Sequence, residues 1–140
     1  MMYVSKRVRF SASHRLHNPR LAEAENRRLF GACNNPNGHG HNYEVEVVVR
    51  GTPDPETGMV VNLTRLKEIL ETRIVGPADY KSLDRDVPFM KGRISTTENL
   101  AQSIWEEVAP QLDRGELHLV RVRESENNVV EYTGPDEDSP

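Results

Sequence analysis

Hydrophobic and polar residues alternate along two stretches in the first third of the chain. In the first, Val4 to His14, one parity carries Val4, Val8, Phe10, Ala12 and His14. The second, His39 to Arg50, alternates in the same way. A period of two residues is typical of a strand with one buried face, so both segments are predicted strands. The polar segment between them, Arg15 to Gly38, is predicted to be a long loop with a short helical turn around Leu21 to Leu29.

Two later segments carry apolar residues at every third or fourth position, which is typical of helices that bury one face. The apolar face of the first comprises Leu63, Leu66, Leu70 and Ile74. This helix should end at Gly76-Pro77. The apolar face of the second comprises Leu100, Ile104, Val108 and Leu112. The second helix should begin at the capping-box pattern Ser95-Thr96-Thr97-Glu98.

Alternation returns in Leu117–Ser125 and Val129–Tyr132, with a turn at Glu126–Asn128 between them. The predicted order is therefore strand, strand, helix, helix, strand, strand. This order favours an α+β fold in which two helices lie on one face of an antiparallel sheet.

Composition restricts the classes of function. The 140 residues carry a net charge of −4, and Asp136, Glu137 and Asp138 lie in the last five positions, so the rest of the chain is nearly neutral. This balance argues against a nucleic-acid partner or an anionic membrane. The chain has no run of ~20 apolar residues, no apolar signal core and a single cysteine, so we expect a cytoplasmic protein. Only 36% of residues are hydrophobic, and association between copies would help this lean core.

Three histidines are the strongest chemical signal. His39 and His41 are two residues apart on a predicted strand, so both imidazoles point to one face. His14 shares the parity of the apolar residues of the first strand, and pairing of the two strands would bring it to the others. Three imidazoles suit zinc and leave a fourth position for water or substrate. The alternative is hydrogen-bonded core histidines, and His17 and His118 have no comparable neighbours.

Cys33 lies six residues before His39 on the turn-rich loop. Three roles are open to it: an inert small hydrophobic residue, a fourth zinc ligand in a structural site, or a thiolate whose pKa a metal lowers below its usual value of about 8.5. A polar loop argues against the first role, and the sequence leaves the other two open.

Several motifs together resemble the 6-pyruvoyl-tetrahydropterin synthase family. They are FSASHRL at 10–16, CNNPNGHGHNY at 33–43, DPETGMV at 54–60, NLT at 62–64, STTEN at 95–99 and ESENN at 124–128. Because the resemblance runs in order from about residue 8 to 134, it predicts a single domain over residues 1–134. The acidic tail, residues 135–140, falls outside it.

The resemblance implies a tunnelling fold with a four-stranded antiparallel sheet and two helices between its strand pairs. Three subunits would join their sheets into a barrel, and two trimers would stack into a homohexamer with active sites between subunits. The implied activity is that of a carbon–oxygen lyase that converts 7,8-dihydroneopterin triphosphate to 6-pyruvoyl-tetrahydropterin and eliminates triphosphate. It needs no external redox cofactor, because the side-chain carbons are oxidised while the pterin ring is reduced.

The resemblance also implies a role for each histidine of the cluster and for the cysteine. His14, His39 and His41 would hold Zn²⁺, which acts as a Lewis acid on the side-chain hydroxyls and acidifies the adjacent C–H bonds. Cys33 matches the thiolate that abstracts the proton.

Substrate-binding positions are implied in the second half of the chain. Glu124 matches the carboxylate that anchors the pterin by accepting two hydrogen bonds from it. Thr96, Thr97 and Glu98 match substrate-binding positions and also suit the start of a helix, and the two roles are compatible. The residues that hold the triphosphate are not indicated, although Lys81 is one candidate.

The bacterial sister activity, 6-carboxy-tetrahydropterin synthase of queuosine biosynthesis, uses the same substrate and fold. Its usual motif places the cysteine four residues before His-Gly-His, whereas the separation here is six, as in the pyruvoyl-forming enzymes. The spacing therefore favours the pyruvoyl product.

The chain departs from the family at its proton relay. The family pattern Asp-His-Lys-x-Leu-Asp reads DYKSLD at residues 79–84, so Asp79 is present but Tyr80 replaces the histidine. An imidazole titrates near neutrality, whereas a phenol with a pKa of about 10 is a poor base at pH 7. We prefer Tyr80 as a proton donor in a modified relay. The alternatives are that His17 or His118 takes over, or that the protein is a weakly active pterin-binding relative.

Two other classes of function remain. A generic zinc hydrolase would leave Cys33 and Glu124 without roles. A non-catalytic pterin-binding or structural zinc protein would bind pterin without releasing triphosphate.

Overall fold

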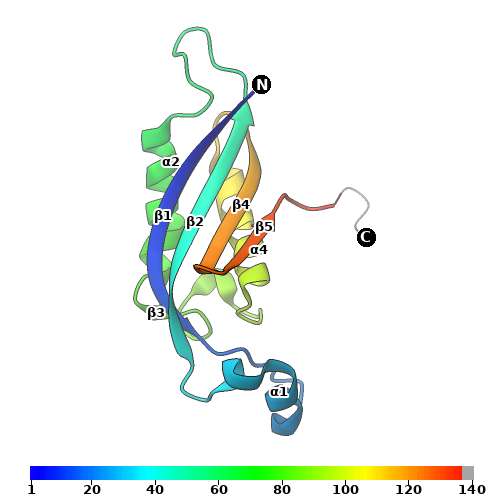
Figure 1. Ribbon diagram of the computed structural model, residues 1–140. Coiled ribbons are helices and arrows are strands. Elements are labelled where there is room, and N and C mark those ends of the chain that lie inside the picture. The colour runs from blue at the N-terminus through cyan, green and yellow to red at the C-terminus, as the bar shows by residue number, and fades with distance from the viewer. Residues whose placement is uncertain (137–140) are drawn as a thin grey trace.

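In the computed structural model, which describes residues 1–136, one sheet forms the body of the protein (Figure 1). Its strands are β1 (Met2–His14), β2 (His39–Gly51), β3 (Lys81–Ser82), β4 (Glu116–Ser125) and β5 (Asn128–Tyr132). They lie in the order β3-β1-β2-β4-β5, and each neighbouring pair is antiparallel except β1 and β3. Most of the predicted acidic tail, from residue 137 on, lies outside the described residues.

The α-helices of the described residues are α1 (Glu23–Phe30), α2 (Leu63–Leu70), α3 (Gly76–Ala78) and α4 (Thr97–Val108). Short 3₁₀ turns cover Gly31–Asn34, Pro88–Met90 and Ala109–Gln111, and a π-helical turn covers Glu71–Val75. Helices α2 and α4 cover one face of the sheet, while α1 lies apart, beyond the ends of β1 and β2 (Figure 1). Between residues 1 and 136, no helix has the length and apolar character needed to cross a membrane.

The α+β class is confirmed, but the expected four-stranded, wholly antiparallel sheet is wrong in one respect. The two-residue strand β3 adds a fifth strand, and it pairs in parallel with Ala12 and Ser13 of β1. Two residues are too few to produce a period in the sequence, and β3 forms only because the chain returns to the edge of β1 after α3.

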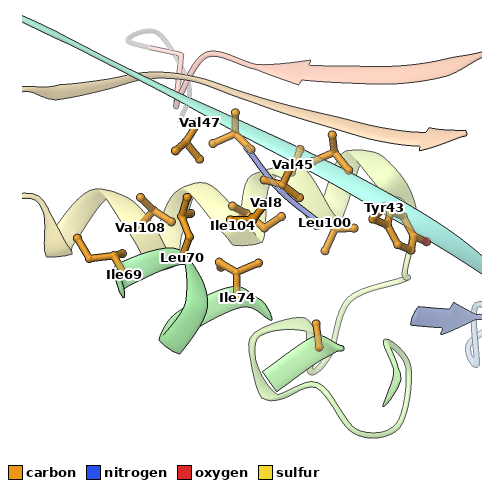
Figure 2. Close-up of a cluster of buried hydrophobic side chains, with 14 of the residues drawn as sticks. Val8, Tyr43, Val45, Val47, Ile69, Leu70, Ile74, Leu100, Ile104 and Val108 are labelled. Carbon is orange, nitrogen blue, oxygen red and sulfur yellow. The ribbon is translucent and has the colours of Figure 1, made fainter. Parts of the chain in front are cut away.

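The core lies between the sheet and helices α2 and α4 (Figure 2). One parity of β1 and of β2 is buried, as predicted, and Val45, Val47 and Val49 of β2 have no exposed surface. From the helices, Leu70, Ile74, Leu100, Ile104 and Val108 pack against these strands. Burial of this apolar face is the main force that holds the helices on the sheet.

The first predicted helix needs two corrections. Leu63 is the first residue of α2 and remains 47% exposed, so it is not part of the buried face. Ile69, which was not expected on that face, is buried. Gly76-Pro77 does not end the helical path, because a π-helical turn leads into the short helix α3, where Pro77 occupies a first-turn position that needs no amide donor.

The second predicted helix begins one residue later than the capping-box pattern indicates. The hydroxyl of Thr96 accepts the Asn99 amide at 3.2 Å, so Thr96 rather than Ser95 is the N-cap of α4. Ser95 is buried, and its hydroxyl donates to Asp84 instead. The helix ends at Val108, so Leu112, expected on its inner face, follows a 3₁₀ turn and is partly buried.

Candidate active site

Pairing of β1 with β2 brings the three histidines together. His14 lies opposite His39, and Ala12 lies opposite His41, so all three imidazoles project from neighbouring positions on the buried parity. The predicted antiparallel pairing of these strands is therefore confirmed. The ligand nitrogens of His14, His39 and His41 all lie within 4.8 Å of one another.

The proton positions leave nitrogen lone pairs for a cation. The Nδ1 of His14 donates to the Ser95 carbonyl at 2.7 Å, so its Nε2 is free of a proton in the neutral ring, and this Nε2 lies 3.1 Å from the Nε2 of His39. Within the described residues, the Nε2 of His41 is buried without a hydrogen-bond partner. A buried polar atom rarely lacks a partner, so a zinc ion bound by three imidazoles fits these residues.

Electrostatics favour the neutral, metal-binding form of His41. Burial lowers the pKa of His41 below 6.5, and the neighbouring rings of His14 and His39 lower it further, against the opposing effect of Glu124. Burial also raises the pKa of Tyr43 above its ordinary value, and its hydroxyl lies 3.4 Å from the Nδ1 of His14. His41 and Tyr43 are therefore uncharged at neutral pH.

A carboxylate lies beside this cluster. The Oε1 of Glu124, near the end of β4, is 3.7 Å from the Nε2 of His41, and its Oε2 accepts a hydrogen bond from the Thr97 hydroxyl at the start of α4. A depression of about 340 Å³ opens here, and its walls are formed by Thr97, Glu98, Glu124, Asn127, Asn128, Val129 and Val130. Three of the four substrate-binding residues predicted from the sequence therefore share one surface, whereas Thr96 caps the helix behind it.

Cys33 lies on the loop next to the histidines but not among them. It is half-buried in the 3₁₀ turn Gly31–Asn34, and its carbonyl accepts the amide of Leu16, two residues after His14. Among residues 1–136, the group of side chains that could hold a metal comprises the three histidines without Cys33.

Asp79 and Tyr80 lie at the edge of the sheet, beside the end of β1. The carboxylate of Asp79 accepts the amide of Ser11 at 2.9 Å. Tyr80 has a positive φ of 59° and an 87% exposed side chain, and it lines a depression with Ser11, Ser13 and His41. Tyr80 and one histidine of the cluster, His41, therefore line the same depression within one chain.

The two remaining histidines do not join the cluster in one chain. The Nδ1 of His17 lies 3.1 Å from the side-chain amide nitrogen of Asn34. His118 packs edge-on against Tyr3, with ring centroids 4.8 Å apart, near the opposite end of β4 from Glu124. A register shift in β4, where Leu117 and Leu119 face consecutive β2 residues, leaves His118 without a partner.

One functional group escaped the sequence analysis. The Ser95 carbonyl sets the tautomer of His14, yet a carbonyl is common to every residue and leaves no trace in the sequence. Only the approach of the segment before α4 to the end of β1 reveals it.

Three convergent imidazoles with a neighbouring carboxylate, on an α+β scaffold, form a group that could hold a metal ion. The sequence model described as 6-pyruvoyl tetrahydropterin synthase matches residues 3–135. The chain belongs to this family of enzymes.

Individual relatives agree with this assignment. The chain is 53% identical to the 6-pyruvoyl tetrahydrobiopterin synthase of Homo sapiens over 131 residues, which cover 94% of this chain and 90% of the relative. The structure of the Caenorhabditis elegans 6-pyruvoyl tetrahydropterin synthase superimposes with a TM-score of 0.90 at 39% identity and covers 96% of both chains. A putative 6-carboxy-5,6,7,8-tetrahydropterin synthase of Archaeoglobus fulgidus is 36% identical over 89 residues, which cover 64% of this chain and 68% of the relative.

Proposed function

We propose that this protein converts 7,8-dihydroneopterin triphosphate to 6-pyruvoyl-tetrahydropterin and eliminates triphosphate, as a zinc-dependent carbon–oxygen lyase of tetrahydrobiopterin biosynthesis. The observation that carries the proposal is the convergence of three imidazoles beside the Glu124 carboxylate. Similarity to relatives named 6-pyruvoyl tetrahydrobiopterin synthase over more than nine-tenths of the chain supports it.

His14, His39 and His41 hold the zinc ion through their nitrogen lone pairs. When bound, zinc supplies a Lewis acid that polarises the side-chain hydroxyls of the substrate and acidifies the neighbouring C–H bonds. The Ser95 carbonyl keeps the proton on the Nδ1 of His14. The hydrogen bond from Thr97 holds the carboxylate of Glu124 in place. Glu124 then accepts hydrogen bonds from the pterin ring and orients the side chain toward the histidines.

Cys33 removes the proton as a thiolate, and Asp79 with Tyr80 forms the modified relay. Because Tyr80 is exposed at the edge of the sheet, the relay serves a site on a neighbouring subunit of a homohexamer. The two free edges of the sheet support such an assembly. The strand β3 covers only Ala12 and Ser13 of β1, and β5 is the last strand on the other side.

The six-residue separation between Cys33 and His39 favours the pyruvoyl product over the carboxy product. The relatives support the same choice, because the match to the human pyruvoyl-forming enzyme is longer and closer than the match to the putative carboxy-forming enzyme.

The test is incubation of the zinc-loaded protein with 7,8-dihydroneopterin triphosphate, with products identified by mass. The expected products are 6-pyruvoyl-tetrahydropterin and triphosphate in equal amounts, and Glu124→Gln should abolish most turnover while Glu116→Gln, at the far end of β4, should not. A carboxy product with acetaldehyde would establish the sister activity instead. Pterin binding without turnover would make the protein a binding relative.

A further inference from the structure

A cavity of about 730 Å³ opens beside His14, its lining does not include Glu124, and the proposed roles above leave it without an occupant. Three segments form its wall: the chain that follows β1, the residues just before β2, and the connection between β3 and α4. Of the three zinc-binding histidines, it is lined by His14 alone. The cavity therefore begins where the reacting part of a substrate would be held.

The cavity is rich in positive charge. Arg15, Arg20, Arg85 and Arg93 line it, with Asp84 as its only lining carboxylate. Asp84 is already occupied, because it accepts the backbone amide of Arg15 at 2.6 Å and the hydroxyl of Ser95 at 2.5 Å. With four arginines and one carboxylate among its lining residues, the wall keeps an excess of positive charge.

Two of these arginines are available to a ligand. Arg93 is paired with Glu106 at 2.7 Å, and Arg15 donates through Nε to the Asn34 carbonyl at 3.0 Å. Arg20 and Arg85 are exposed, and neither forms an ion pair with any carboxylate of residues 1–136. A guanidinium presents a planar fork of donors that matches the oxygens of a phosphate.

We propose that this cavity binds the triphosphate group of the substrate, with Arg20 and Arg85 as its principal contacts. The proposal rests on the proposed function and adds a subsite to it. A molecule built as pterin, hydroxylated side chain and triphosphate matches a site built as the Glu124 depression, the histidine cluster and the arginine cavity in the same order.

The other cationic candidate, Lys81, does not share this cavity. Its ammonium lies 3.5 Å from the Gly76 carbonyl, and Lys81 lines the depression that contains Tyr80. The arginine cavity is therefore better placed than Lys81 to hold a polyanion next to His14.

Binding of inorganic triphosphate to the full-length protein, measured by calorimetry, tests the subsite. Arg20→Gln and Arg85→Gln should each weaken binding about tenfold, as expected for the loss of a charge-assisted hydrogen bond. Both positions are exposed, so the variants should fold normally. The matched control is Arg27→Gln, because Arg27 is an exposed arginine of α1 that pairs with Glu23 outside the cavity.

Because triphosphate also chelates zinc, the titrations are run on zinc-loaded and metal-free protein. If Arg20→Gln and Arg85→Gln weaken triphosphate binding equally in the zinc-loaded and the metal-free protein, the subsite is supported. Triphosphate binding that needs zinc, or that neither substitution affects, overturns it. With the substrate itself, the two variants should raise KM by a similar factor and change kcat less. Turnover with an unchanged KM would reject the subsite alone, and arginine-dependent triphosphate binding without turnover would reject the proposed reaction alone.

Discussion

His14 owes its value as a ligand to a backbone carbonyl. A neutral imidazole carries its proton on either nitrogen, and the 2.7 Å contact with the Ser95 carbonyl holds it on Nδ1. His41 is prepared differently, because burial disfavours its charged form and leaves its Nε2 without a partner among the described residues. Both rings therefore offer a nitrogen lone pair to a cation, His14 because of a hydrogen bond and His41 because of burial.

Removal of His41 should therefore remove the metal. We expect His41→Ala to lower zinc affinity by at least about 100-fold, beyond the usual effect of changing an outer-shell partner. Competition with a chromophoric chelator measures this affinity. The control is His118→Ala, which removes a histidine that packs on Tyr3, and equal losses in both variants would contradict the assignment.

The lowered pKa of His41 also predicts how the metal-free protein responds to acid. Because the unfolded chain binds this proton more readily than the folded chain, the contribution of His41 to stability is complete above about pH 6.5 and is lost as the pH falls through its lowered pKa. Urea unfolding between about pH 7.5 and 5 measures the loss. His41→Gln should reduce this dependence on pH, and an unchanged dependence would show that His41 does not titrate this way.

Tyr80 is the residue at which the chain departs from its family. If its phenol donates a proton in the relay, Tyr80→His should raise turnover at pH 7 by about tenfold, within the range of general acid–base effects, and should shift the optimum toward neutrality. Rates recorded from about pH 6 to 10 measure this. Tyr80→Phe, which keeps the ring and loses the hydroxyl, should be slower than the parent, and identical profiles for all three proteins would exclude position 80 from the reaction.

At the scale of elements, the start of α4 serves both the fold and the site. Thr96 caps the helix by accepting the Asn99 amide, and the next residue, Thr97, donates to Glu124. The capping bond fixes where the first turn begins, and so it sets the direction of the Thr97 side chain. Glu124, near the end of the neighbouring strand β4, then lies within hydrogen-bonding distance of the Thr97 hydroxyl.

Loss of this cap should be measurable without any substrate. Thr96→Ala should lower the free energy of unfolding by about 1 kcal/mol, the usual value for an N-cap, whereas Thr96→Ser should keep it because serine retains the accepting oxygen. Chemical denaturation measures both variants. An equal loss in the two would mean that the methyl group, and not the hydroxyl, matters.

At the scale of the whole molecule, the proposed machinery of one chain is divided between the histidine cluster and the exposed edge of the sheet. The three histidines and Glu124 lie together, whereas Tyr80 is exposed beside β1 and lines a depression with His41. The uncovered face also carries an ion-paired row in which Glu46 lies between Arg7 and Arg121. An assembly that pairs the free sheet edges would bring the relay of one subunit to the histidines of another.

Complementation between two inactive variants tests this arrangement. His39→Ala and Asp79→Asn should each be inactive alone, and their co-expression should restore about a quarter of the wild-type activity if each site needs both residues from different subunits of a symmetric oligomer. Sedimentation should place the particle at six times the 15.9 kDa of one chain. Mixed oligomers without activity would require both residues in one subunit.

Local patterns predicted the long strands, the positions of both core helices and the three metal-binding candidates, because alternation and helical spacing are properties of neighbouring residues. They missed the strand β3 and the helical continuation through Gly76-Pro77, which depend on where the chain returns after α2. The motif at residues 95–99 was recognised, but the identity of its capping residue was not, since Ser95 is taken by Asp84 from a distant segment.

The sequence by itself therefore predicted the family and the candidate metal ligands, and it has a tyrosine at position 80 where the resemblance implies a histidine, because each is a matter of which residues occur and at what spacing. Only the tertiary structure decided which nitrogen of His14 carries the proton, that Glu124 lies 3.7 Å from His41, and that Asp79 and Tyr80 lie beside the edge of β1. These features join residues up to about eighty positions apart, and their distances follow from strand register and helix packing rather than from any local pattern.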